Sequence, residues 1–108
     1  MTRYLLIESR DPFESNGFAQ RCDLAAALIA DGAEVTMYLV ENAVLAARGG
    51  ADLAELAQLS RLGVSVVADE FALHERGIAA TELARTVKSA PLDMLVNELG
   101  SGAKALWN

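Results

Sequence analysis

Cysteine and long apolar runs are the first things this sequence lacks. Its only thiol is Cys22, which excludes an internal disulfide and any zinc site built from several cysteines. No stretch approaches eighteen uninterrupted apolar residues, and the run at residues 4–7 is too short for the apolar core of a signal peptide. We therefore expect a soluble protein of the cytoplasm that has no membrane partner.

Positive charge is also scarce. Nine lysines and arginines face fifteen aspartates and glutamates, so the formal net charge is −6. This balance argues against a surface that binds the phosphates of nucleic acid. The chain also has no dinucleotide-binding glycine pattern, Walker-type loop, GxSxG elbow or HExxH pair. Its one histidine, His74, has no second histidine or cysteine nearby, so we expect neither a metal nor a cofactor.

Apolar residues, by contrast, are abundant. They make up 53% of 108 residues, whereas charged residues make up 22%, which is typical of a globular chain. A chain of this length forms one domain, residues 1–108, and so high an apolar share favours a buried subunit interface. We expect a homo-oligomer or a complex with another subunit.

The apolar pattern predicts alternating strands and helices. Strand character is found at residues 4–7, 34–40, 64–67 and 103–107, although the last segment can also be a frayed tail. Helical spacing is found at residues 18–31, 43–47, 52–62, 81–87 and 91–99, with Ser15 or Asn16 capping the first helix and Leu92, Leu95, Val96 and Leu99 facing inward from the last. The short connections predict an α/β fold, a small parallel sheet of about five strands with helices on both faces, as in three-layer flavodoxin-like or Rossmann-like proteins.

The loop after the third strand carries the densest group of reactive side chains. Ligands of parallel α/β sheets bind at the carboxyl ends of the strands, because the loops converge there. The candidate pocket residues in this loop are Asp69, Glu70, His74 and Arg76. Other polar residues that we place near strand ends are Asp11, Asn16 and Asn42.

Each candidate also has a structural interpretation. Asp69 and Glu70 suit acid–base work, yet neighbours after a strand usually point apart, which favours capping or solvation. Arg76 suits an anion, but pairing with Asp69 or Glu70 is the more ordinary role. Cys22 lies on the apolar stripe of the first helix, where we expect it to be a small buried hydrophobe and not a reactive thiol.

Taken in order, several segments resemble the DsrE/DsrF-like sulfur-relay family. The segments that carry the resemblance are Asp11-Pro12, the passage from Ala25 to Val44, the strand, loop and L-x-x-RG pattern from Val64 to Gly77, residues 87–93, and the terminal KALW. The resemblance implies a small parallel α/β fold of the DsrE type and assembly into dimers, trimers or hexamers. In members that transfer sulfur, it also implies a persulfide passed from one cysteine to another protein.

The chain departs from that family where the chemistry takes place. The relay cysteine of the family stands seven residues before the arginine of the RG pair, which here is Asp69, and a second cysteine of some members falls on Ala72. Neither residue can form a persulfide. Two hypotheses follow: a non-catalytic subunit that binds a small ligand or a cysteine-bearing relative, or an enzyme or sulfur carrier that uses Asp69, His74 and Arg76 in place of the thiol.

Overall fold

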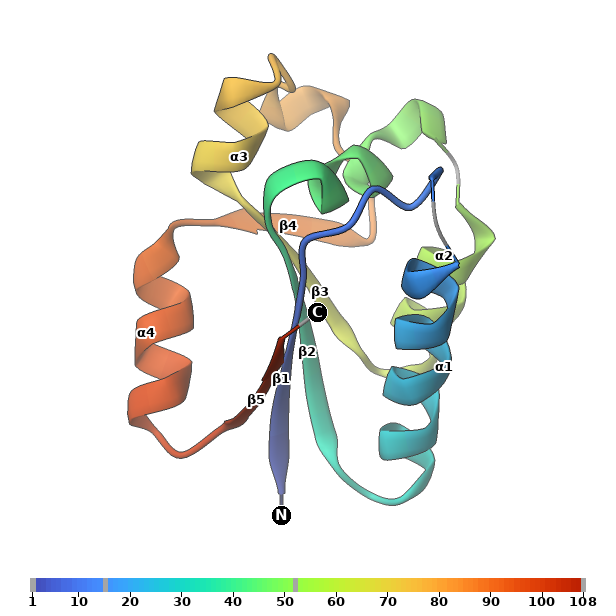
Figure 1. Ribbon diagram of the computed structural model, residues 1–108, viewed down its shortest axis with the longest axis vertical. Coiled ribbons are helices and arrows are strands. Elements are labelled where there is room, and N and C mark those ends of the chain that lie inside the picture. The colour runs from blue at the N-terminus through green and yellow to red at the C-terminus, as the bar shows by residue number, and fades with distance from the viewer. Residues whose placement is uncertain (1, 15, 52, 108) are drawn as a thin grey trace.

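The computed structural model describes residues 2–14, 16–51 and 53–107. Five strands form one parallel sheet in the order β4-β3-β2-β1-β5 (Figure 1). The strands are β1 (Arg3–Glu8), β2 (Glu34–Leu39), β3 (Ser65–Asp69), β4 (Val87–Ala90) and β5 (Lys104–Trp107). The α-helices are α1 (Gly17–Ala30), α2 (Ala54–Leu62), α3 (Glu70–Glu75) and α4 (Leu92–Gly100), and the 3₁₀ helices are η1 (Glu41–Ala47), η2 (Gly49–Ala51) and η3 (Ala80–Glu82).

The sheet lies between two helical layers. Helices α1 and α2 cover one face, and α4 covers the other (Figure 1). Successive side chains of a strand point to opposite faces, so Met37 of β2 packs under α1 and α2 whereas Tyr38 packs under α4. The predicted three-layer parallel fold is confirmed. Both sides of the central strands are buried, which explains why their sequences are nearly continuous apolar runs.

All five strands point the same way, so their carboxyl ends meet at one edge of the sheet. Helices η1, α3 and η3 lie at this edge, which is the top of Figure 1. The chain runs outward from β1 through β2 and β3 to β4, then returns to place β5 on the free side of β1. The terminal segment is therefore a parallel edge strand, and the frayed tail is excluded.

Several predicted helix ends are correct and others are not. Helix α1 ends as predicted before Gly32, whose φ of +89° suits glycine. Asn16 stands at the N-cap of α1, but its side chain makes no capping hydrogen bond there. The alternative cap, Ser15, and the predicted start of α2, Asp52, lie outside the described residues.

The helix predicted at residues 81–87 is wrong. Only the turn of η3 is helical there, and Val87 begins β4. Val87 pairs with Val66 of β3 and is buried. This strand has four residues, too few for the sequence to show alternation, and its pairing with β3 decides its conformation.

The inward face predicted for the last helix is largely wrong. Leu95 is buried, but Leu92, Val96 and Leu99 are 57%, 60% and 44% exposed. Helix α4 lies over this face of the sheet (Figure 1), and no described element covers the three side chains on its outer side. An apolar stripe on α4 therefore faces outward. No helix in the described ranges is both long and apolar enough to cross a membrane.

Candidate functional site

Asp69 lies at the end of β3 and begins a helix, not the loop that the sequence predicted. The residue is 9% exposed and is the N-cap of α3. Its Oδ2 accepts a hydrogen bond from the Ala72 backbone N–H at 3.0 Å, and its Oδ1 accepts one from the Tyr38 hydroxyl at 3.0 Å. Both carboxylate oxygens therefore have structural donors, which is how a buried carboxylate is stabilised.

Tyr38 is the partner that the sequence did not identify. It is fully buried on β2, and its hydroxyl also lies 3.3 Å from the carbonyl oxygen of Ala90 on β4. Burial, followed by the hydrogen bond to Asp69, raises the pKa of Tyr38 well above its ordinary value. The hydroxyl stays protonated and acts as a donor at the carboxyl edge of the sheet.

Glu70 and His74 lie on α3 but do not join Asp69. Both are exposed, whereas Asp69 is buried. Glu70 is in the first turn of α3, where a negative charge is favourable, and His74 is in its last turn. The three side chains therefore do not form a shared acid–base pocket. Asp69 caps a helix and Glu70 is solvated, which is the structural interpretation given from the sequence.

Arg76 binds a different partner from the two that the sequence suggested. Its Nε and Nη2 donate to Oδ1 of Asn42 at 3.2 and 2.9 Å, and its Nη1 donates to the Ala72 carbonyl at 3.1 Å. The predicted pairing with Asp69 or Glu70 is therefore wrong. Arg76 instead links the end of α3 to η1. Two of the residues predicted near the strand ends, Arg76 and Asn42, are therefore in contact.

The remaining predicted residues lie in the connection between β1 and α1. Oδ1 of Asp11 accepts a hydrogen bond from the Phe13 backbone N–H at 2.8 Å, which forms an Asx turn. Asn16 is exposed at the start of α1. Asp11 thus shapes the turn, and neither residue is bonded to Asp69 or Arg76.

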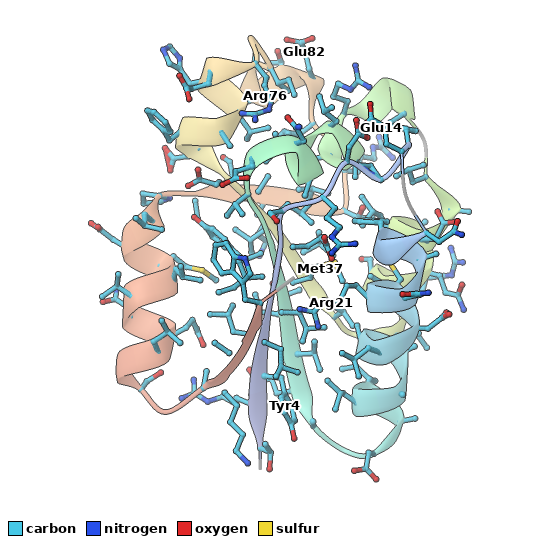
Figure 2. The ribbon with its side chains drawn as sticks, viewed as in Figure 1. Tyr4, Glu14, Arg21, Met37, Arg76 and Glu82 are labelled. Atoms are coloured by element: carbon cyan, nitrogen blue, oxygen red, sulfur yellow. The ribbon has the colours of Figure 1, made fainter. Side chains whose placement is uncertain are left out.

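Glu8 is a buried acid at the same edge that the sequence did not single out. It ends β1, is 0% exposed, and accepts a hydrogen bond at Oε1 from the Arg10 backbone N–H at 3.0 Å. Arg21 of α1 reaches toward the sheet (Figure 2). Its Nε lies 3.6 Å from Oε2 of Glu8, and its Nη2 donates to the Leu106 carbonyl of β5 at 3.0 Å. The only sign of this buried acid in the sequence is that Glu8 directly follows an apolar run. Its partner Arg21 comes from another element, so no local pattern shows the pair.

Cys22 is buried on α1, as predicted. Burial first, and then the charges of Glu55, Asp23 and Glu8, raise its pKa to about 12. A protonated thiol is a poor nucleophile. Cys22 therefore has the character of a small apolar side chain.

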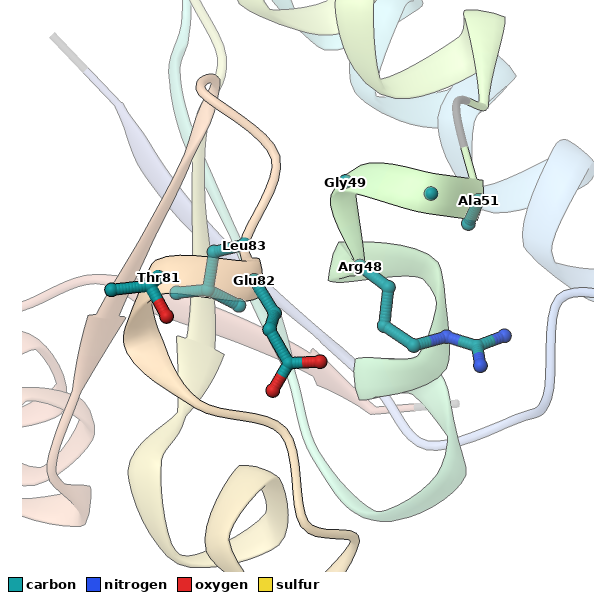
Figure 3. Close-up of a pocket in the computed structure, with 7 residues that line it drawn as sticks. Arg48, Gly49, Ala51, Thr81, Glu82 and Leu83 are labelled. Carbon is teal, nitrogen blue, oxygen red and sulfur yellow. The ribbon is translucent and has the colours of Figure 1, made fainter.

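A surface cavity that the sequence did not predict lies between the helical turns η2 and η3. Its volume is about 590 Å³, and its lining residues are Arg48, Gly49, Gly50, Ala51, Thr81, Glu82 and Leu83 (Figure 3). A Cβ at Gly49 would lie 3.3 Å from the Glu82 carbonyl oxygen, so the close approach of the two walls favours glycine. The described residues contain no group of three or more His, Cys, Asp or Glu placed to hold a metal ion.

These features define a small three-layer parallel α/β protein whose strand-end acids are held by structural hydrogen bonds. No protein-family model matches the chain, and no curated protein matches it. Solved structures with this fold include YchN from E. coli, which is 22% identical with a TM-score of 0.89, both chains being covered in full.

Two further solved structures are described as proteins of unknown function. MTH1491 from Methanobacterium thermoautotrophicum is 16% identical with a TM-score of 0.84, and both chains are covered in full. BT1422 from Bacteroides thetaiotaomicron is 18% identical with a TM-score of 0.79, over 98% of this chain and 94% of that one. At these identities the likeness establishes a shared fold.

Proposed function

We propose that this protein is a DsrE/DsrF-like subunit of the cytoplasm that takes part in sulfur metabolism by binding and not by carrying sulfur. It acts as a homo-oligomer or in complex with a cysteine-bearing relative. The proposal rests on the identity and the surroundings of Asp69. The resemblance places the relay thiol at this position, and here the side chain is a buried carboxylate with a donor on each oxygen.

The surrounding residues support the same conclusion. The second cysteine position of the family is Ala72, which is buried and whose backbone N–H donates to Asp69. Cys22, the one thiol of the chain, is buried with a pKa of about 12. A persulfide relay needs an accessible thiolate, and these residues do not supply one.

The outer stripe of α4 is the surface that we propose for self-association. Leu92, Val96 and Leu99 are spaced by four and three residues, so they lie on one side of the helix. A second copy of the chain related by a twofold axis would place the same stripe against it, because a twofold interface pairs a surface with itself. Trp107 of β5 is a further exposed large apolar side chain, 64% accessible.

The enzyme hypothesis has less support from the geometry. Asp69 is buried and fully bonded, His74 is exposed, and Arg76 is bonded to Asn42. A carboxylate whose two oxygens both accept structural hydrogen bonds is held in place as a helix cap. We therefore retain the binding subunit as the proposed function.

Sulfur loading tests the proposal. The folded native protein and a sample unfolded in denaturant are each incubated with polysulfide. The intact mass of each sample is measured before and after the incubation. We expect no added sulfur on the folded chain and addition at Cys22 once denaturant exposes it; the Cys22→Ala variant should gain none in either state. Folded native protein that takes up sulfur and passes it to an acceptor thiol would overturn the proposal.

Self-association is tested by sedimentation of the native chain, whose monomer mass is 11.5 kDa. We expect a species larger than a monomer, converted to monomer by Val96→Glu. The matched control is Leu62→Glu on α2, which is 42% exposed on the opposite side of the sheet and should leave the assembly intact. A native chain that stays monomeric at high concentration and binds no cysteine-bearing relative contradicts the binding-subunit role.

A further inference from the structure

A second cavity adjoins the one between η2 and η3. It has a volume of about 340 Å³ and shares Arg48, Gly49 and Leu83 with the first. The two cavities therefore share part of one wall, where Arg48 and Leu83 form a backbone bridge, and we call the pair the groove and each cavity a compartment. Both volumes fall within the range of roughly 300–1,000 Å³ that is usual for small-molecule sites.

The compartment formed by the second cavity is mainly apolar. Its apolar lining residues are Ala46, Leu53, Leu56, Ala57, Leu83 and Ala84. Leu56 belongs to the core, so the floor of this compartment is fixed by the packing of α2 against the sheet. A flexible hydrocarbon tail would find a preformed apolar surface there.

Two arginines line the same compartment, although the chain as a whole is acidic. Arg48 donates from Nε to the Leu45 carbonyl at 3.2 Å, which fixes its stem beside the groove. Within the described ranges, its two terminal nitrogens have no hydrogen-bond or ion-pair partner. Arg85 also lines the second cavity and is exposed. Guanidinium groups of this kind bind carboxylates through paired hydrogen bonds.

Glu82 sets the direction in which a ligand lies. Its carboxylate stands across the first cavity from Arg48 (Figure 3), and its Oε1 accepts a hydrogen bond from the Ala79 backbone N–H at 2.8 Å. A negative group in the first cavity would meet this like charge as well as Arg48, whereas in the second it would meet Arg48 and Arg85 and no carboxylate among the described lining residues. The charges thus favour an anionic head at the arginines with its tail against Leu53 and Leu56.

We propose that this groove binds a small monocarboxylic acid with an apolar tail. The head is held by Arg48 and Arg85, and the tail occupies the apolar compartment. The site depends on residues of η1, α2 and the segment before β4, and it uses neither Asp69 nor the outer stripe of α4. It therefore stands whether or not the chain is a subunit of a sulfur-handling complex.

The probe is hexanoate, compared with hexylamine and hexanamide, which have the same tail and a positive or neutral head. Binding is followed by the backbone amide resonances of the isotope-labelled native chain. We expect hexanoate to shift the amides of Gly49 and Thr86, which line the second cavity, and to leave that of Gly32, in the turn between α1 and β2, unchanged. The amine and the amide should bind at least about tenfold more weakly, since charge-assisted hydrogen bonds are worth roughly 1.5–3 kcal/mol.

Three variants locate the head and the tail. Arg48→Gln and Arg85→Gln should each weaken hexanoate binding about tenfold, with Arg61→Gln on the exposed end of α2 as the matched control that changes nothing. Ala57→Leu fills the apolar compartment without altering charge and should abolish the Gly49 and Thr86 shifts, with an unchanged amide spectrum elsewhere as the check on folding. Equal binding of hexanoate and hexylamine, or shifts that map to α4, would overturn the proposal.

Discussion

The hydroxyl of Tyr38, on the face of the sheet that α4 covers, lies 3.0 Å from Oδ1 of Asp69 at the end of β3. This bond joins the two residues that decide what the strand-end site can do. Asp69 stands where the resemblance places a relay thiol, and Tyr38 supplies a buried neutral donor to its carboxylate. A side chain held in this way positions the start of α3.

The first prediction concerns that bond. Tyr38→Phe keeps the ring and removes the donor, which leaves a buried carboxylate with the Ala72 N–H as its remaining described donor. We expect the free energy of unfolding to fall by about 1–3 kcal/mol, because an unsatisfied buried acceptor loses its compensation for desolvation. Urea unfolding measures the change. Tyr4→Phe, on a half-buried residue of β1, is the control and should have a much smaller effect.

The second prediction concerns alkaline pH. Tyr38 and Cys22 both have pKa values raised above those of the unfolded chain, for Cys22 from 9.0 to about 12. Above pH 9 the unfolded chain loses the Cys22 proton while the folded chain keeps it, so fewer protons are bound in the unfolded state and stability falls as pH rises. The slope reaches at most about 1.4 kcal/mol per pH unit for each group. Unfolding curves between pH 8 and 11 should show less slope for Cys22→Ala than for the native chain.

The same burial predicts slow chemistry at Cys22. Alkylation by iodoacetamide at pH 8 should proceed far more slowly in the folded chain than in denaturant, since the thiol is protonated and 6% exposed. The rate is read by intact mass. A folded chain that is modified as fast as the unfolded one would show that α1 opens readily around Cys22.

The third prediction concerns the buried pair at the end of β1. Arg21→Met removes the cation that lies 3.6 Å from Glu8 and the donor to the Leu106 carbonyl of β5. Breaking a buried ion pair from one side typically reduces stability by about 3–5 kcal/mol. We also expect faster hydrogen exchange in β5, an edge strand that pairs only with β1 among the described strands. Arg10→Met, on an exposed residue of the loop after β1, is the control; equal stability of the two variants would show that the pair is not structural.

The fourth prediction concerns Arg76 and Asn42. Arg76→Lys keeps the charge but loses the geometry that lets two nitrogens donate to Oδ1 of Asn42. The site is partly exposed, so we expect a loss of roughly 0.5–1.5 kcal/mol together with faster amide exchange in α3. Asn42→Ala should have a similar effect, and the double variant should add little to either single one. Full additivity in that cycle would mean that the two side chains do not act together.

Sequence periodicity predicted the elements that bury one continuous apolar stripe or run. Residues 4–7, 34–40 and 64–67 are largely apolar because both faces of a parallel strand are covered. Helix α1 ends before Gly32 because glycine readily adopts a positive φ. The start of strand β4 was predicted as the end of a helix, because its four residues are too few to show the alternation of apolar and polar residues that is typical of a strand. The outward stripe of α4 was mistaken for core because an amphipathic pattern tells which residues share a side, not which side is covered.

For the candidate site, the sequence by itself determined the chemistry that is absent and the edge at which polar side chains gather. A chain with one cysteine, placed on the apolar stripe of α1, has no relay thiol after β3 in any conformation. Tertiary structure alone decided the partners: Tyr38 with Asp69, Asn42 with Arg76, Arg21 with Glu8, and the groove between η2 and η3. These contacts join residues far apart in the chain, and local patterns record which side chains need a partner but not which one the fold supplies.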